Sequence, residues 1–477
     1  MKKINEEVDV HNFSGAFDLI KEKRDVLNKV SPTFCLAKWL QSTVLLQNGE
    51  THSCHHPGRH KIQVADIIDN PSGIHNTPIK LIARDEMLDG IQTKECRYCW
   101  NIENLKEDYI SDRIYKSSFS WSWPHLQKVL VSGVGADIEP TYLEVSFENT
   151  CNFKCLYCGP ESSSRWQDEV DKHGGIQLSK FNINDPIWLK EIGKWPIRHD
   201  EYNPYVEAFW KWWPTLYPNL HTFRITGGEP LLSKHTWKVL DYIKANPRKD
   251  LLFAINTNMN APIQLQEKLL TYIRDIGDKI KGFHIYTSLE NTGEQAEYVR
   301  HGLEYEQFLK NCKTVLDSTG SNVEFHIMTT VNVLSTPTFL NFLQLMKKFK
   351  EDYQISKHDF RVKFRVNYLR WPECLNIILL SKQDKERYAK EWLEFVEANA
   401  ITKEKHDWQT FLLEDVDQVK RLCDYMLSTN PTKNDFVDFR TFISTCDSRR
   451  NTNFSTTFPE LTYLTDNNYY GDVNEQS

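Results

Sequence analysis

Three closely spaced cysteines are the most distinctive chemical feature of this sequence of 477 residues. Cys151, Cys155 and Cys158 form a C-x3-C-x2-C loop, which places three thiols within eight residues. Such a compact loop can provide one thiolate to each of three irons in a four-iron cluster. The fourth iron would keep an open coordination position, and an open position allows a metal centre to take part in chemistry. The alternative is a zinc knuckle whose fourth ligand lies elsewhere in the chain.

A second segment with chemical potential reads Thr226-Gly227-Gly228-Glu229-Pro230. Two adjacent glycines let the backbone approach a ligand closely, and the Glu229 carboxylate can pair with a ligand ammonium group. A Gly-Gly pair alone would indicate only a turn. Because Glu-Pro follows the pair at the end of an expected strand, the segment is predicted to be a ligand-binding loop.

Four more cysteines lie in the N-terminal part of the chain, at Cys35, Cys54, Cys96 and Cys99. The first two are spaced C-x13-G-x4-C and the last two C-x2-C. The chain has eleven cysteines, an odd number, and no export signal, so disulfides are not expected. Four thiolates can complete the coordination of an iron–sulfur cubane, but this spacing also suits a structural zinc ion. In a zinc site His55, His56 or His60 could replace a thiol, and unliganded thiols are a third alternative.

Strands that alternate with helices are expected to position these motifs from residue 141 onward. The predicted strands lie at 141–148, 221–226, 251–258, 283–290, 323–333 and 360–369. Parallel β/α units carry their functional loops at the carboxyl ends of the strands, where the cysteine loop and the Gly-Gly segment fall. Six units are too few for a closed eight-stranded barrel. We therefore expect an α/β fold with a partial (β/α)6 TIM-like barrel.

The chain is expected to divide into three regions. Residues 1–135 form an N-terminal Cys-rich auxiliary domain that includes an amphipathic helix at 13–29, residues 136–370 form the core, and residues 371–477 form a helical C-terminal region. The net charge of −7 does not indicate a nucleic-acid or anionic-membrane surface. Because no apolar stretch is long enough to span a bilayer and no secretory signal is apparent, a cytoplasmic protein without a membrane partner is expected.

Together, the cysteine loop and the Gly-Gly-Glu-Pro segment resemble the hallmarks of the radical S-adenosylmethionine (SAM) enzymes, with Tyr157 as the aromatic residue of the loop. The resemblance covers about residues 140–370. It implies that Cys151, Cys155 and Cys158 are catalytic and hold a 4Fe–4S cluster that binds SAM. Such enzymes cleave SAM to a 5′-deoxyadenosyl radical, which takes hydrogen from a substrate. A reductant such as flavodoxin or ferredoxin is the implied partner.

The resemblance also implies which residues contact SAM. Gly227, Gly228 and Glu229 would contact the methionine moiety, and Tyr157 would lie by the adenine. The other implied cofactor-binding residues are Pro230 of the motif and, at later strand ends, Asn256, Thr257, Ser288, Arg300, Val331 and Asn332. Polar residues are common at strand ends, so these later positions also fit plain loop residues.

The N-terminal cysteines resemble the opening signature of twitch and SPASM auxiliary-cluster domains, with Gly49 as the signature glycine. Those domains usually follow the core, whereas this one precedes it. It has fewer cysteines than a full SPASM domain, which indicates one auxiliary cluster, a second 4Fe–4S cluster with zinc as the alternative. Proteins with this arrangement look like a family found in marine phages, which would place the chain in the host cytoplasm.

The leading functional hypothesis is a radical SAM oxidoreductase or maturase that acts on a peptide or protein. The second hypothesis keeps the radical chemistry but directs it to a nucleoside, RNA or another small metabolite. A non-catalytic metal-binding scaffold is the third hypothesis, although a scaffold has no need of an open cluster beside a Gly-Gly-Glu-Pro loop.

Overall fold

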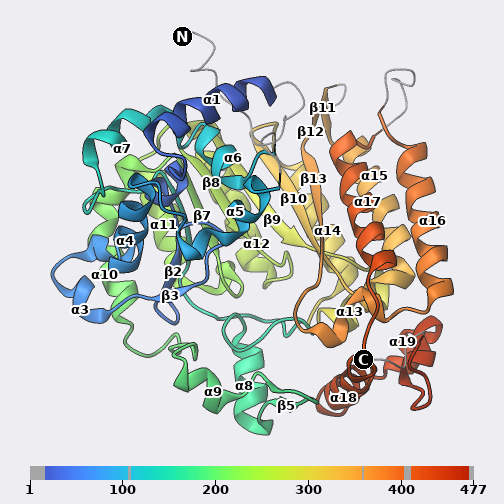
Figure 1. The fold of residues 1–477 in the computed structure, drawn as a ribbon. Coiled ribbons are helices and arrows are strands. Elements are labelled where there is room, and N and C mark those ends of the chain that lie inside the picture. Colours follow the sequence, from blue (N-terminus) through green and yellow to red (C-terminus); the bar gives the residue numbers. More distant parts are fainter. Residues whose placement is uncertain (1–16, 106–108, 357–358, 402–409, 472–477) are drawn as a thin grey trace. The chain divides into compact units, whose positions relative to one another are not determined.

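The computed structural model describes residues 17–105, 109–356, 359–401 and 410–471. Its contacts divide the chain into two compact units. Unit 1 comprises Met1–Glu148, Pro196–Gly227 and Arg248–Ala254, and unit 2 comprises Asn149–Trp195, Gly228–Pro247 and Ile255–Ser477. Each unit combines helices with parallel strands (Figure 1).

The sheet of unit 1 is built around three parallel strands. β4 (Tyr142–Ser146) lies between β1 (Gln41–Leu45) and β7 (Thr222–Thr226) and pairs in parallel with both. Beyond β1, the short strands β2 (Glu50–His52) and β3 (His60–Lys61) continue the sheet in antiparallel fashion. All five residues of β1 are buried, as in a parallel strand that is covered on both faces.

Six helices of unit 1 contribute to an apolar cluster that includes three of the N-terminal cysteines. Trp39 and Phe34 belong to this cluster, together with Cys35, Cys96 and Cys99. The six helices are α1 (Phe17–Val30), α2 (Leu36–Leu40), α4 (Pro78–Leu88), α5 (Arg97–Glu103), α6 (Asp112–Ser118) and α7 (Leu126–Ser132). The unit also contains α3 (Val64–Ile68) and α10 (Pro204–Leu216), which contact each other. The expected helix at 13–29 corresponds to α1, and its residues 13–16 lie outside the described residues.

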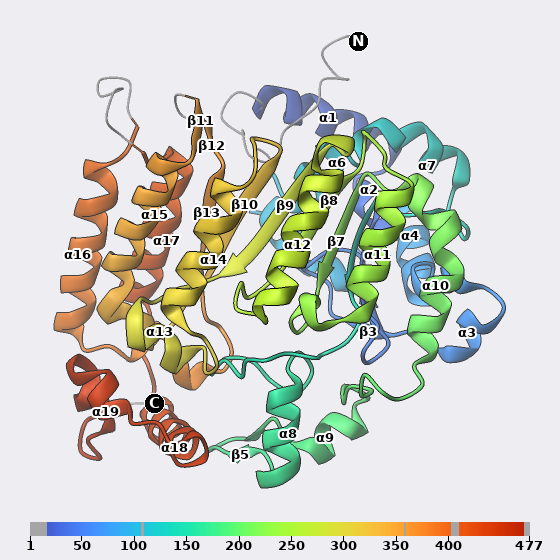
Figure 2. The ribbon, with the colours of Figure 1, turned by 180° about the vertical axis from the view of Figure 1, so that it is seen from behind.

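The sheet of unit 2 has three long parallel strands. β10 (Val323–Val331) lies between β9 (Gly282–Ser288) and β13 (Val362–Tyr368). Along β9, buried residues alternate with half-buried ones, so one face carries apolar side chains and the other carries polar side chains. Figure 2 shows α12 (Ile263–Ile276) and α14 (Tyr305–Asp317) in front of these strands.

Most of the remaining elements also belong to unit 2. Its other helices are α8 (Ser164–His173), α9 (Pro186–Glu191), α11 (Lys234–Ala245), α13 (Gly293–Val299), α15 (Phe339–Asp352), α16 (Lys382–Ala398), α17 (Leu413–Ser428), α18 (Lys433–Arg450) and α19 (Phe454–Thr457). The pairs β5 (Ile176–Gln177) with β6 (Asn182–Ile183), and β11 (Gln354–Ser356) with β12 (Asp359–Phe360), are short antiparallel ribbons. β8 (Leu252–Asn256) begins in unit 1 and ends in unit 2.

The structure confirms the α/β class, and strands are present at all six expected positions. The closure of these strands into a partial barrel, the separate Cys-rich domain and the three-region division stay predictions. The structure also contains β1, β2 and β3, which the sequence did not predict. The sequence of β1 lacks a clear alternation of polar and apolar residues, and its polar residues are buried along with the apolar ones.

Within the described residues, no helix is both long enough and apolar enough to cross a membrane.

Candidate cofactor sites

The cysteine loop follows β4 directly and is fixed by backbone hydrogen bonds. The N–H of Lys154 donates to the carbonyl of His301, and the N–H of Leu156 donates to the carbonyl of Val299, both at 2.9 Å. Cys151, Cys155 and Cys158 are free thiols, and all three residues are half-buried. The loop is therefore held against the end of α13 with its three sulfurs unbridged.

Burial disfavours the charged form of each thiol in this loop. Burial and, to a smaller extent, the neighbouring Cys155 raise the pKa of Cys158 to about 12. Burial also raises the pKa of Cys151, with Cys155 as the second cause. Closely placed thiols of this kind become thiolates when they bind a metal, because the metal supplies the positive charge that they lack. The donor set therefore fits the three-cysteine cluster that the resemblance implies.

A buried network connects Tyr157 and Arg300, which the sequence analysis had assigned separately. The hydroxyl of Tyr157 donates to Oε1 of Glu290 at 2.8 Å, and Nη2 of Arg300 lies 2.6 Å from Oε2 of the same carboxylate. The guanidinium carbon of Arg300 also lies 5.5 Å from the centre of the Tyr157 ring. Although burial raises the pKa of Cys155 most strongly, the positive charge of Arg300 acts in the opposite direction. Arg300 therefore favours the thiolate form of one proposed cluster ligand.

Glu290 is a site residue that the sequence analysis missed. Only 1% of its surface is exposed, and a buried carboxylate is expected to have charged or hydrogen-bonding partners. Its position at the end of an expected strand was an available signal, because the carboxyl ends of parallel strands carry site residues.

The C-terminal helix α18 supplies a second anchor that the sequence did not reveal. Nη1 of Arg450 donates to the carbonyl of Lys154 at 2.9 Å, and the guanidinium carbon lies 4.5 Å from the centre of the Trp166 ring. Nε1 of Trp166 donates to the carbonyl of Cys155 at 2.7 Å. Arg450 also pairs with Glu169 at 3.3 Å. Trp166 is both buried and hydrogen-bonded to the cysteine loop.

The two glycines of the Gly-Gly-Glu-Pro segment lie close to other parts of the backbone. Gly227 has a φ of +124°, and a Cβ added there would lie 2.6 Å from Oγ of Ser146. A Cβ on Gly228 would lie 2.3 Å from the carbonyl oxygen of Thr150, at the start of the cysteine loop. Both positions therefore require glycine for reasons of space within the protein itself.

The Glu229 carboxylate is buried and accepts three hydrogen bonds. Its donors are the N–H of Leu231 at 3.0 Å, the hydroxyl of Thr257 at 2.9 Å and the N–H of Asn258 at 2.6 Å. Burial raises the pKa of Glu229 to about 7, and these donors partly oppose that rise. The N–H of Glu229 donates to the carbonyl of Thr150 at 2.7 Å. Glu229 thus connects the cysteine loop with the segment that follows β8.

The other strand-end residues occupy different environments. Asn256 and Ser288 are half-buried last residues of β8 and β9. Val331 is fully buried, and the Asn332 side chain accepts from the N–H of Leu334 at 3.0 Å. Pro230 is buried and begins a short 3-10 turn. Of the expected cofactor-binding residues, Thr257 is thus hydrogen-bonded to Glu229, and Arg300 is linked to Tyr157 through Glu290. Asn332 instead caps the 3-10 turn that follows it.

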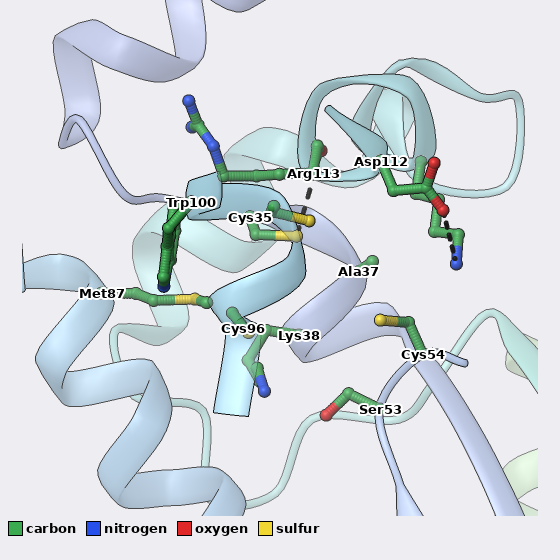
Figure 3. A pocket seen from close by; sticks show the side chains of 12 residues that line it. Cys35, Ala37, Lys38, Ser53, Cys54, Met87, Cys96, Trp100, Asp112 and Arg113 are labelled. Carbon is green, nitrogen blue, oxygen red and sulfur yellow. Dashed lines mark hydrogen bonds and ion pairs between the residues drawn. The ribbon is translucent and has the colours of Figure 1, made fainter. Parts of the chain in front are cut away.

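The four N-terminal cysteines line one pocket in unit 1. Figure 3 shows Cys35, Cys54 and Cys96 around it, and Cys99 is the fourth member. The four thiols are free. The fold brings them together from distant parts of the sequence.

Burial disfavours the charged forms of the thiols in this pocket, as it does in the cysteine loop. Burial raises the pKa of Cys35 to about 11, and Cys96 and Cys54 add to the rise. Positive side chains line the same pocket, and two of them are already paired, Lys38 with Glu95 at 2.5 Å and Arg113 with Glu103 at 2.9 Å. These thiols therefore also fit a metal group, which would stabilise their charged forms.

Two of the histidines that were considered as zinc ligands have other partners. Nε2 of His56 lies 2.7 Å from Asp112, and Nε2 of His60 lies 2.8 Å from the hydroxyl of Thr77. His55, which follows Cys54 in the sequence, is exposed.

Comparisons with known proteins extend these observations. No model of a protein family matches the chain. The chain is 25% identical over 222 residues to the GTP 3′,8-cyclase of Campylobacter lari, which covers 46% of this chain and 55% of the relative. It is also 25% identical over 171 residues to the GTP 3′,8-cyclase of Aliarcobacter butzleri, which covers 35% and 40% respectively. The chain thus spans about half the length of the curated relatives that it matches.

Among solved structures, SuiB of Streptococcus suis bound to S-adenosylmethionine aligns with 75% of this chain and 70% of its own, at 12% identity and a TM-score of 0.31. That score is too low to support a common fold. The sequence matches carry more weight, because GTP 3′,8-cyclases are radical SAM proteins. The curated relatives thus belong to the class of enzymes that the two motifs of this chain resemble.

Proposed function

We propose that this protein is a radical SAM enzyme whose cluster is held by Cys151, Cys155 and Cys158. The observation that carries the proposal is the set of three free, half-buried thiols on one loop, beside the Gly-Gly-Glu-Pro segment. When bound, the reduced cluster supplies the electron that cleaves SAM to methionine and a 5′-deoxyadenosyl radical. A one-electron reductant of the flavodoxin or ferredoxin class is the proposed partner.

The side chains around the loop would hold it in one geometry and screen it from water. Arg300 favours the thiolate of Cys155, and Glu290 fixes Arg300 and Tyr157 in place. Glu229 fixes the distance between the cysteine loop and the end of β8. A site that is held in this way before the substrate arrives avoids the cost of reorganisation during the reaction.

Anaerobic reconstitution tests the proposal. The reduced wild-type protein should form 5′-deoxyadenosine from SAM, and replacement of any one of the three cysteines by Ala should abolish this product. Cys312→Ala is the matched control, because Cys312 is a fully buried thiol of α14 outside both cysteine groups. Cleavage at the wild-type rate in Cys151→Ala, Cys155→Ala or Cys158→Ala would refute the assignment.

The proposed substrate is a peptide or protein, by analogy with the twitch and SPASM enzymes that the N-terminal cysteines resemble. The two cyclase matches favour a second candidate, a nucleotide or related small molecule. Formation of 5′-deoxyadenosine in the presence of GTP, other nucleoside triphosphates and peptide pools distinguishes the two classes. Hydrogen abstraction from a substrate should raise the yield only with the right class.

The N-terminal cysteines are proposed to hold a second iron–sulfur cluster. Their four thiols line one pocket, and four thiolates can complete the coordination of an iron–sulfur cubane. A structural zinc ion on the same thiols is the alternative.

A further inference from the structure

A group of polar side chains shares one face of the sheet in unit 2, away from both cysteine groups in the sequence. His284 and Tyr286 lie on β9, Glu324 and His326 lie on β10, and Lys363 lies on β13. The register pairs His284 with Glu324, and it pairs His326 with both Tyr286 and Lys363. Because side chains two residues apart on a strand point to the same face, all five lie on one side of the sheet.

Three of these side chains converge on one point. Nε2 of His326 lies 3.1 Å from Oε2 of Glu324, and Nε2 of His284 lies 3.7 Å from the same oxygen. The three ligand atoms lie within 4.8 Å of one another. Two imidazole nitrogens and one carboxylate oxygen form a common ligand set for zinc and related divalent ions.

The surroundings hold this group rigidly. The ring of Tyr286 stacks on the ring of His326 with centroids 4.5 Å apart and planes 14° apart. His326 is 2% exposed and the His284 side chain 12% exposed, whereas the Glu324 side chain is 24% exposed. All three ligands are on strands, which position side chains more precisely than loops. The site is therefore preorganised, yet a small ion can still reach it past the carboxylate.

A metal ion would have to compete with Lys363 for the Glu324 carboxylate. Its Nζ lies 2.9 Å from Oε2 of Glu324 and balances the charge of the carboxylate in the absence of a metal. With a metal bound, the same ammonium can remain a hydrogen-bond donor to the ligating carboxylate, as groups around metal ligands often do. Its positive charge would still repel the ion and weaken binding.

We propose that His284, Glu324 and His326 form a binding site for a divalent transition-metal ion of the zinc class. The three protein ligands leave the fourth tetrahedral position open for water or for a substrate group. None of these ligands belongs to either cysteine group, and the inference does not depend on the proposed SAM chemistry.

Zinc binding to the iron-loaded protein tests the site. After reconstitution, the protein is equilibrated with Zn²⁺, desalted, and analysed for zinc and iron in the same sample. The wild type should retain about one zinc per chain with its iron content unchanged, which shows that the zinc has not entered the cysteine sites. Glu324→Gln keeps the shape of the side chain but removes its charge, and it should bind zinc at least tenfold more weakly.

Two further variants complete the test. His199→Ala removes an exposed histidine elsewhere and should bind zinc like the wild type. Lys363→Met removes the competing ammonium and should bind zinc several-fold more tightly. Zinc should also raise the melting temperature of the wild type but not that of Glu324→Gln. No retained zinc in the wild type, equal retention by Glu324→Gln, or weaker binding by Lys363→Met would overturn the site in favour of a metal-free ion-pair network.

Discussion

At the residue scale, Glu290 determines how Tyr157 and Arg300 are held beside the cysteine loop. Its two oxygens have different partners, the Tyr157 hydroxyl at 2.8 Å and the Arg300 guanidinium at 2.6 Å. Arg300 and Glu290 are 7% and 1% exposed, so the pair has little contact with water. A buried pair of this kind is expensive to break, because the remaining charge stays buried without a partner.

Glu290→Gln should therefore destabilise the apoprotein by about 3–5 kcal/mol, since it leaves the Arg300 charge unbalanced. Tyr157→Phe is the matched comparison, because it removes only one hydrogen bond and should cost about 1 kcal/mol. Chemical denaturation of the two variants measures both free energies of unfolding. Equal losses would show that the ion pair contributes no more than the hydroxyl.

Glu229 gives a prediction about SAM affinity. If its carboxylate pairs with the SAM ammonium, Glu229→Gln removes a charge-assisted contact of about 1.5–3 kcal/mol and weakens binding roughly 10- to 100-fold. Equilibrium binding of SAM to the reconstituted protein measures this change. An unchanged Kd would mean that Glu229 serves only to join Thr150, Thr257 and Asn258.

The sequence was informative wherever the chemistry lies in consecutive residues. The cysteine loop and the Gly-Gly-Glu-Pro segment could be recognised because their types and spacing are local. The strand-end position of Glu290 was a signal, but the roles of Glu290 and Arg450 could not be recognised, since they depend on partners 133 and 296 residues away in the chain. The zinc-class group could not be recognised either, because His284 meets Glu324 only through strand register.

At the element scale, α18 anchors the cysteine loop through its last residue. Arg450 contacts the Lys154 carbonyl, the Glu169 carboxylate and the face of Trp166, and Trp166 in turn donates to Cys155. The planar guanidinium can make these contacts together, which a lysine cannot do. The helical C-terminal region thus contributes directly to the loop that is proposed to hold the cluster.

Arg450→Ala should loosen this loop and speed the loss of iron from the reconstituted protein to a chelator. The cost in stability should be about 3 kcal/mol or less, because Glu169 keeps its ion pair with Lys154 at 2.6 Å. Arg450→Lys should restore the charge but only part of the iron retention. Lys433→Ala, at the exposed start of the same helix, is the control. Iron loss at the wild-type rate in Arg450→Ala would contradict the anchoring role.

The short strands of unit 1 illustrate why some elements escape a sequence pattern. The segment Gln41–Leu45 contains polar residues that would face solvent on an ordinary half-exposed strand. They are buried here because β1 is an inner strand, between β4 and β2, and both of its faces are covered. The strand is therefore defined by its tertiary neighbours, which local propensity does not register.

At the scale of the whole molecule, the two compact units are not formed by consecutive parts of the sequence. Unit 1 combines residues Met1–Glu148 with two later segments, since β7 joins the sheet that contains β1 and β4. Sequence position alone predicted boundaries near residues 135 and 370. It could not predict that the N-terminal cysteines and the strand before the cysteine loop belong to one compact unit.

The number of metal groups is the property of the whole molecule that most directly tests the proposed function. With one cluster on each cysteine group, the reconstituted protein should contain about eight irons, four per cluster. SAM should perturb the spectrum of only one cluster, because the loop of Cys151 leaves one iron open whereas the N-terminal group has four thiols. Replacement of Cys96 and Cys99 together should halve the iron and keep the SAM-responsive signal.

The same double variant separates the cluster from the zinc alternative. If the N-terminal group transfers electrons, the variant should still cleave SAM but should fail to complete turnover of the true substrate. If the group holds structural zinc, the wild type should contain about four irons and one tightly bound zinc, and loss of the two thiols should destabilise the fold. Elemental analysis of wild type and variant decides between these outcomes. Four irons with one zinc at the N-terminal cysteines would overturn the redox role, because zinc has a single accessible oxidation state and cannot carry an electron.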